Sequence, residues 1–174
     1  DALYKYMYDQ NANNLGVTIL AIEEPEAHLH PIYQRLLYKY VVNNSNSPVI
    51  ITTHSTYISS VAPIRSIVHL VGQKAGTMVS TTAKISLSDK EEIDLARYID
   101  VKRGEIYLAK GIIFVEGIAE EYLVPSFAQT IGVELDRYGI VVCNVNSTNF
   151  IPYKQFADLL NIPNVIITDG DYYH

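Results

Sequence analysis

The amino-acid sequence predicts an α/β fold in two pieces, each built around a parallel β-sheet. Short apolar runs that end in acids or a histidine alternate with segments of helical periodicity, first over residues 17–54 and again over 111–171. This alternation is typical of βαβ units, whose buried parallel strands carry ligand-binding groups at their carboxyl ends. With 174 residues, of which 48% are hydrophobic, the chain has enough apolar side chains for a core. We therefore expect functional groups at the strand tips of both sheets.

The first predicted strand covers residues 17–22, an apolar run that is too short for an ordinary helix. Because the run is continuously apolar, we expect a central strand that is covered on both faces. It ends in Glu23 and Glu24, and Pro25 stops it. Two adjacent carboxylates cannot both enter an apolar interior without a large desolvation cost, so they should meet a cation, water or phosphate. A solvated acidic strand end is the alternative.

A helix and a second strand are predicted next. Residues 32–42 indicate an amphipathic helix that packs on the sheet through one apolar stripe, formed by Ile32, Leu36, Leu37 and Tyr40. Turn residues occupy 43–48, and 49–52 predict another buried strand. His54 lies just beyond the carboxyl end of that strand. It either reaches a ligand beside Glu23 and Glu24 or merely caps the helix that follows.

The middle of the chain predicts a hairpin and a connecting helix. Residues 66–71 and 77–84 indicate two strands that are joined by a turn between two glycines and carry no evident chemistry. Ser88 fits the N-cap of a capping box with Glu91 at its third helical position. A helix should therefore begin after Ser88.

The last third of the chain repeats the opening pattern. Residues 111–115 predict a buried strand that ends in Glu116, and Gly117 permits a tight turn into a helix over 119–131. We expect Pro125 to kink or divide this helix, and four apolar residues to face inward. The four are Tyr122, Leu123, Phe127 and Ile131. Two more buried strands, at 139–144 and 165–168, flank a helix at 150–160.

Carboxylates gather at the tips of these strands. Asp169 and Asp171 follow the last strand, and Glu120 lies one helical turn after Glu116. Parallel neighbouring strands would bring Glu116 and Asp169 to the same sheet edge. Four carboxylates so close would repel one another unless cations neutralised them, and oxygen ligands select magnesium, manganese or calcium over zinc. The alternative is an acidic sheet edge balanced by basic groups elsewhere. Glu121 should lie on the surface.

The composition argues against several classes of protein. A formal net charge of −6 does not suggest a surface that coats nucleic acid, although clustered acids suit a metal-dependent nuclease. No apolar run approaches the roughly 20 residues that span a bilayer, so we expect no membrane partner. The lone Cys143 can form no internal disulfide, which favours a packing role and a cytoplasmic location.

The run Glu-Glu-Pro-Glu-Ala-His-Leu-His-Pro at 23–31 resembles the Walker B and D-loop region of ABC-type ATPases. Its form is that of OLD-family (overcoming lysogenization defect) nucleases and their RecF-like relatives. The resemblance implies that Glu23 holds magnesium and that Glu24 activates the water that attacks ATP. It also implies that His54 is the H-loop residue that bonds to the γ-phosphate. Glu23 departs from the ordinary ABC pattern, which has aspartate at that position.

Two histidines, His28 and His30, fall in the segment that resembles a D-loop, where they would face a partner subunit. A helix-start or packing role is an equal alternative, and a zinc pair is disfavoured because no further ligand shares the spacing. The sequence has no G-x-x-x-x-G-K-[ST] phosphate loop. We therefore expect a fragment that is inactive by itself.

The second half of the chain resembles a Toprim domain, whose two hallmarks are a glutamate after one strand and Asp-x-Asp after a later one. Glu116 and the Asp-Gly-Asp at 169–171 fit both. Glu120 completes a Glu-x-x-x-Glu pair that is a feature of OLD-type nucleases. The resemblance implies that Glu116 is catalytic and that Glu116, Glu120, Asp169 and Asp171 bind Mg²⁺, with Mn²⁺ or Ca²⁺ as alternatives.

Together the resemblances imply an OLD-family ATP-dependent DNA endonuclease, with the Gabija-like proteins as one form of it. Residues 1–86 would form the C-terminal part of an ABC ATPase lobe, 87–110 a connecting helical segment, and 111–174 the N-terminal part of a Toprim domain with a Rossmann-like parallel sheet. The implied partners are DNA, a second copy bound through the ATPase and D-loop region, and a helicase-like protein if the chain is Gabija-like. The alternative is a RecF- or SMC-like DNA-binding ATPase whose Toprim-like domain is not catalytic.

Overall fold

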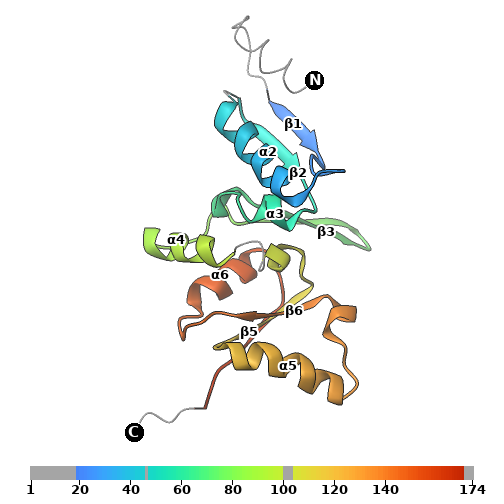
Figure 1. Cartoon of the computed structure of the whole chain (residues 1–174), viewed down its shortest axis with the longest axis vertical. Helices are drawn as coiled ribbons and strands as arrows, with labels where there is room; N and C mark the ends of the chain where they lie inside the picture. Colours follow the sequence, from blue (N-terminus) through green and yellow to red (C-terminus); the bar gives the residue numbers. More distant parts are fainter. Residues whose placement is uncertain (1–18, 46, 100–103, 171–174) are drawn as a thin grey trace, which may run out of the picture. The chain divides into compact units, whose positions relative to one another are not determined.

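The computed structural model describes residues 19–45, 47–99 and 104–170, which form two compact units, Asp1–Val61 and Ala62–His174. The first unit contains β1 (Leu20–Glu23), α2 (Pro31–Asn44), β2 (Val49–Thr52) and α3 (Thr56–Ser59), as Figure 1 shows. The second begins with η1 (Ile64–Ser66), β3 (Val68–Gln73), β4 (Gly76–Thr81), α4 (Asp89–Tyr98) and η2 (Gly104–Leu108). It continues with β5 (Gly111–Val115), α5 (Ile118–Thr130), η3 (Leu135–Tyr138), β6 (Ile140–Asn144), α6 (Ile151–Leu159) and β7 (Asn164–Ile167).

The sheet of the first unit is parallel, as predicted. Leu20 of β1 lies opposite Val49 of β2, and Glu23 lies opposite Thr52. In both strands half-buried residues alternate with exposed ones, and Ile50 is 57% exposed. The prediction that the first strand is covered on both faces is therefore wrong for the described residues, in which one face of β1 and β2 is exposed.

Helix α2 turns a different face inward from the one its apolar stripe predicted. Three residues of that stripe are about half exposed or more: Ile32, Leu36 and Tyr40. The fourth, Leu37, is half-buried, and Val41 is buried. Gln34 shares the inward face, donating to the Leu29 carbonyl and accepting from the Ser55 hydroxyl. These hydrogen bonds, together with the burial of Val41, set the rotation of the helix.

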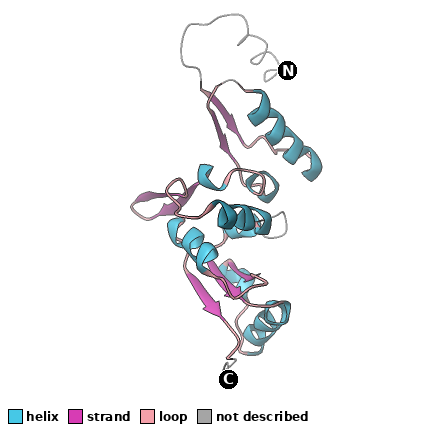
Figure 2. Cartoon of the chain, turned by 90° about the vertical axis from the view of Figure 1, so that its left-hand side faces the viewer, coloured by secondary structure: helices cyan, strands magenta, loops and turns pink. Residues whose placement is uncertain are grey.

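The second unit is built on a three-stranded parallel sheet in the order β6-β5-β7. Val115 of β5 lies opposite Asn144 on one side and Ile167 on the other, which confirms the predicted βαβαβ pattern. α5 and α6 lie on opposite faces of the sheet (Figures 1 and 2), as right-handed crossovers in opposite directions require. The core on the α6 side includes Phe114 and Phe156. Cys143 is buried in β6, which agrees with a packing role, whereas the cytoplasmic location stays a prediction.

Helix α5 is rotated relative to its prediction. The four residues that were expected to face inward are 47% to 78% exposed: Tyr122, Leu123, Phe127 and Ile131. The smaller Val124 and Ala128 are half-buried instead, and α5 contacts β5 and β6. Pro125 lies inside one continuous helix, so it does not divide α5, and the predicted kink stays a prediction. Because apolar residues lie on every side of α5, their periodicity could not indicate its rotation.

The β3–β4 hairpin packs on the carboxyl end of α6. His69 Nδ1 lies 3.1 Å from the Leu160 carbonyl oxygen, and the Ser80 hydroxyl donates to the same oxygen over 3.2 Å. Asn161 donates to the Ser80 hydroxyl. These contacts group the hairpin with the second unit, although the sequence placed it in the ATPase lobe; the predicted domain boundary at residue 86 stays a prediction.

Helix α4 begins at the predicted capping box. The Glu91 amide donates to the Ser88 hydroxyl, and the Glu91 carboxylate accepts from the Ser88 amide. The Ser88 hydroxyl and amide also lower the pKa of Glu91 through their hydrogen bonds. In the described part of the chain no helix is both long enough and apolar enough to cross a membrane.

Candidate functional site

The first candidate site lies where β1 and β2 end side by side. The Glu24 amide donates to the Thr52 carbonyl over 2.9 Å, which extends the parallel register by one residue beyond β1. As a result Glu24 Oε1 lies 3.5 Å from His54 Nε2. The side chains of Glu24 and His54 are 54% and 82% exposed, so their contact is accessible to water and adds little stability. The two groups are therefore near each other and open to a ligand.

The turn after β1 has a fixed and unusual backbone. Glu24 and His28 have φ angles of 40° and 64°, a left-handed region that residues other than glycine seldom adopt. The amide of Ala27 donates to the Glu24 carbonyl and closes the turn. Glu23 is exposed at the end of β1, where a magnesium ion could reach it. Backbone strain of this kind is concentrated at functional sites.

The structure tests the predicted roles of His30 and His54, whereas those of His28 stay predictions. His30 is the N-cap of α2, and its Nδ1 accepts from the Ile32 amide, so the helix-start role is confirmed. His54 is not the cap of the helix that follows it, because the Ser55 hydroxyl accepts from the Ile58 amide and caps α3. The capping alternative for His54 is therefore wrong.

Sequence reasoning assigned no role to Glu26. Its Oε1 accepts from the Thr53 hydroxyl over 2.6 Å and from the His54 amide over 2.8 Å. This carboxylate therefore joins the turn after β1 to the segment after β2. The one sequence feature that could have indicated a role for Glu26 is its position as the third acid of the Glu-Glu-Pro-Glu run.

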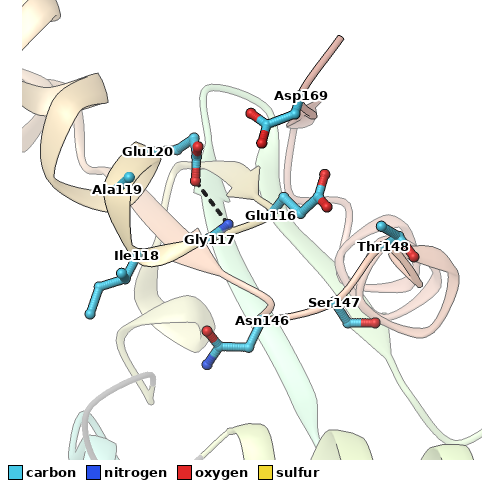
Figure 3. Close-up of a pocket in the computed structure, with 9 residues that line it drawn as sticks. All are labelled: Glu116, Gly117, Ile118, Ala119, Glu120, Asn146, Ser147, Thr148 and Asp169. Atoms are coloured by element: carbon cyan, nitrogen blue, oxygen red, sulfur yellow. Dashed lines mark hydrogen bonds between the residues drawn. The ribbon is translucent and has the colours of Figure 1, made fainter. Parts of the chain in front are cut away.

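The second candidate site is an open cleft of about 510 Å³ at the carboxyl edge of the second sheet. Figure 3 shows Glu116 after β5, Glu120 on α5 and Asp169 after β7 around it. The remaining lining residues are Gly117, Ile118, Ala119, Asn146, Ser147 and Thr148. The parallel register aligns the strand tips, so the predicted meeting of Glu116 and Asp169 at one sheet edge is present.

Glu120 has a structural partner of its own. Its Oε2 accepts from the Gly117 amide over 2.9 Å, the dashed bond in Figure 3. A Cβ at position 117 would lie 2.8 Å from the same oxygen, so glycine is needed for this close approach. The Glu120 carboxylate thus caps the first turn of α5.

Only part of the predicted metal site is present among the described residues. Glu116, Glu120 and Asp169 line one cleft, but within residues 19–45, 47–99 and 104–170 no three acidic, histidine or cysteine side chains come together as a metal-binding group. Asp171 lies outside the described residues. Oxygen donors on a shared sheet edge fit a hard divalent cation, and Glu116 and Asp169 are the side chains that would hold it. The four-carboxylate site stays a prediction.

The loop after β6 supplies a wall of the cleft that sequence reasoning missed. Asn144 is 2% exposed; its amide donates to Glu121 Oε2 over 3.3 Å, and its Oδ1 accepts from the Asn146 amide over 2.7 Å. Asn146 has a φ of 52°, and Ser147 and Thr148 follow it into the lining. Glu121, which was expected on the surface, is half-buried and anchors this loop to α5. The polar residues that directly follow the predicted strand at 139–144 could have indicated this wall of the cleft.

Replacing Gly117 by alanine should release Glu120. The flexible carboxylate would move away from the new Cβ and lose its bond to the 117 amide, at a cost of about 1 kcal/mol. We expect the unfolding temperature to fall by about 2–4 °C in a thermal scan. Glu120→Gln is the matched control, because its amide oxygen still accepts from residue 117. A parental unfolding temperature in Gly117→Ala, with a lowered one in Glu120→Gln, would contradict the capping role.

Comparisons with known proteins match both halves of the chain. Residues 2–59 match the AAA ATPase domain model, and residues 108–171 match the model described as overcoming lysogenization defect protein-like, TOPRIM domain. The first match contains Glu23, Glu24 and His54, and the second contains Glu116, Glu120 and Asp169. The two matches keep the order that the sequence resemblance implied.

Curated relatives carry both segments. The chain is 28% identical to endonuclease GajA of Bacillus cereus (strain HuB5-5), an alignment over 97% of this chain and 28% of that protein. It is 26% identical to the OLD nuclease of Thermus scotoductus over 94% of this chain and 32% of that protein. The chain thus spans about a third or less of the length of these relatives.

A solved structure is similar over a shorter stretch. The C-terminal region of the Burkholderia pseudomallei OLD protein is 51% identical over 37% of this chain and 34% of that chain, with a TM-score of 0.36. The two domain models, by contrast, match longer parts of the chain in total and occur in the expected order. With a segment that matches the AAA ATPase model followed by one that matches the OLD-like TOPRIM model, the chain is similar to overcoming lysogenization defect (OLD) proteins.

Proposed function

We propose that this protein is an ATP-dependent DNA endonuclease that requires a divalent metal ion, in which the TOPRIM cleft cuts DNA and the ATPase site gates the cutting. The observation that carries this proposal is the pairing of Glu116 and Asp169 in one cleft, inside a segment that matches the OLD-like TOPRIM model. The names of two relatives, endonuclease GajA and OLD nuclease, support the same activity. ATPase and TOPRIM domains in general use a nucleotide and a divalent metal ion.

The finer assignments are part of the proposal. Glu116, Glu120, Asp169 and Asp171 would hold Mg²⁺, with Mn²⁺ or Ca²⁺ as alternatives, and such an ion would supply an activated water and charge stabilisation for the phosphodiester. Cleavage would then proceed without a covalent bond between a tyrosine and DNA. In the ATPase site, Glu23 would bind Mg²⁺ while Glu24 and His54 act at the γ-phosphate of ATP.

The assembly is proposed on the same basis. ATPase sites of the ABC type are shared between two copies, so a homodimer through the D-loop region around 27–30 is expected. A helicase-like partner is proposed only for a Gabija-like protein, which the relationship to GajA supports.

Two observations favour the alternative, a RecF- or SMC-like ATPase with a TOPRIM domain that binds DNA without cutting it. Glu120 is engaged by the Gly117 amide, and no group of three metal ligands forms within the described residues. Incubating the purified full-length protein with supercoiled plasmid separates the two functions. We expect nicking with Mg²⁺ or Mn²⁺ that EDTA abolishes and that ATP modulates. DNA binding without cleavage in Mg²⁺, Mn²⁺ or Ca²⁺ would support the alternative instead.

A further inference from the structure

Glu26 is the one acid of the Glu-Glu-Pro-Glu run whose carboxylate turns toward the protein. A single oxygen, Oε1, accepts from both the Thr53 hydroxyl and the His54 amide, residues that lie 27 and 28 positions further along the chain. Both donors belong to the segment that carries His54, and the acceptor belongs to the turn that carries Glu24. The two halves of the candidate ATPase site therefore meet at one carboxylate oxygen.

The bonds of Glu26 continue into a closed ring. The Thr53 hydroxyl accepts from the Ser55 amide, and the Ser55 hydroxyl donates to Gln34. Gln34 in turn donates to the Leu29 carbonyl, which lies in the same turn as Glu26. This ring ties residues 26–29 to residues 53–55 at both ends. A shift of one segment therefore moves the other.

The second carboxylate oxygen of Glu26 argues against a role in stability alone. Oε2 is buried, and within the described residues it has no hydrogen-bond partner. A buried carboxylate oxygen without a partner costs free energy of folding. The other oxygen, Oε1, makes two short hydrogen bonds, to Thr53 and to the His54 amide. We therefore explain the buried glutamate by the segment that these two bonds hold in place.

We propose that Glu26 is a positioning residue of the ATPase site, which sets the backbone of His54 against the turn of Glu24. The inference rests on the proposed function, because it concerns hydrolysis at Glu24 and His54. Glu26 binds neither metal nor phosphate. It keeps His54 Nε2 near Glu24 Oε1, a distance of 3.5 Å, and makes that distance depend on the position of residues 26–29.

The test measures ATP turnover of full-length variants. Glu26→Ala removes the acceptor and should lower kcat by about 10- to 100-fold, the range expected when a reacting group is misplaced by about an ångström, with little change in KM. Glu26→Gln keeps an oxygen that accepts from both donors and should stay within about threefold of the parent. Thr53→Val removes one donor at nearly constant shape and should lower kcat by an intermediate factor. Glu105→Gln, an exposed acid in the other unit, is the control.

Amide hydrogen exchange of His54 gives a readout that is independent of turnover. Loss of its bond to Glu26 should speed exchange by up to about 10-fold in Glu26→Ala and leave it unchanged in Glu26→Gln. Parental turnover in Glu26→Ala would overturn the proposal. So would lost turnover in Glu26→Gln with a protected His54 amide, because charge and not position would then be the cause.

Three further outcomes distinguish a failure of this inference from a failure of the proposed function. If Glu26→Ala does not fold, Thr53→Val decides, and its parental kcat would overturn the positioning role. If the parent hydrolyses ATP and Glu24→Gln does not, the proposed ATPase site stands whatever Glu26 does. A parent without any ATP hydrolysis refutes the proposed ATPase activity and, with it, this role for Glu26.

Discussion

Glu24→Gln in the full-length protein should abolish ATP hydrolysis and leave ATP binding in place. Glutamine keeps the shape of the side chain at the tip of β1 but cannot take a proton from water, and loss of a general base typically costs about 10²- to 10⁴-fold in rate. The neighbouring His54, whose Nε2 lies 3.5 Å from Glu24 Oε1, cannot replace it because its expected partner is the phosphate. Phosphate release and binding of a fluorescent ATP analogue measure the two properties separately.

The same variant should accumulate as an ATP-bound homodimer. If the site is shared between two copies, blocking hydrolysis holds the copies together, which size-exclusion chromatography with and without ATP would show. Glu105→Gln, whose side chain is exposed in the second unit, should behave like the parent in every assay. Hydrolysis by Glu24→Gln at the parental rate would mean that another group activates the water.

Glu116→Ala and Asp169→Ala should each abolish metal-dependent DNA nicking and leave ATP hydrolysis largely intact. Both side chains line the cleft at the carboxyl edge of β5 and β7, and loss of either would remove a proposed ligand of the ion. A bound divalent ion stabilises the transition state by several kcal/mol, so we expect a loss of about 10²-fold or more. Conversion of supercoiled plasmid to the open circle measures it.

The control for the two nuclease variants is Asp136→Asn, which changes an exposed acid of η3 that does not line the cleft. It should cut DNA like the parent. If Glu116→Ala and Asp169→Ala also cut normally, the nuclease site lies elsewhere. A tyrosine linked covalently to DNA would replace the proposed water-activated cleavage with a topoisomerase-like mechanism.

Strand tips were the predictable part of both sites. A short apolar run that ends in an acid indicates a strand and its polar end, and the parallel register then brings Glu24 near His54 and Glu116 into the cleft with Asp169. The register follows from the order of strands and helices along the chain. These pairings could therefore be predicted without any knowledge of side-chain contacts.

Helix rotations and long-range polar contacts could not be predicted. α5 carries apolar residues on every side, so its hydrophobic pattern did not show that Val124 and Ala128 face inward while Phe127 faces solvent. The bond from Glu26 to the His54 amide spans 28 positions, and that from Asn144 to Glu121 spans 23. Such contacts leave no periodic signal, because each depends on one polar pair that the finished fold brings together.

The attachment of the β3–β4 hairpin to α6 bears on how the TOPRIM domain should be excised for study. An expressed segment that begins after residue 86 would lack Ile64 and Ile85, which belong to the same core as Phe156, and would leave the Leu160 carbonyl without the side chains of His69 and Ser80. Freshly exposed apolar surface of this kind promotes aggregation during purification. A segment that begins at Ala62 retains the hairpin and its hydrogen bonds, so it is the better starting point for crystallising or titrating this domain in isolation.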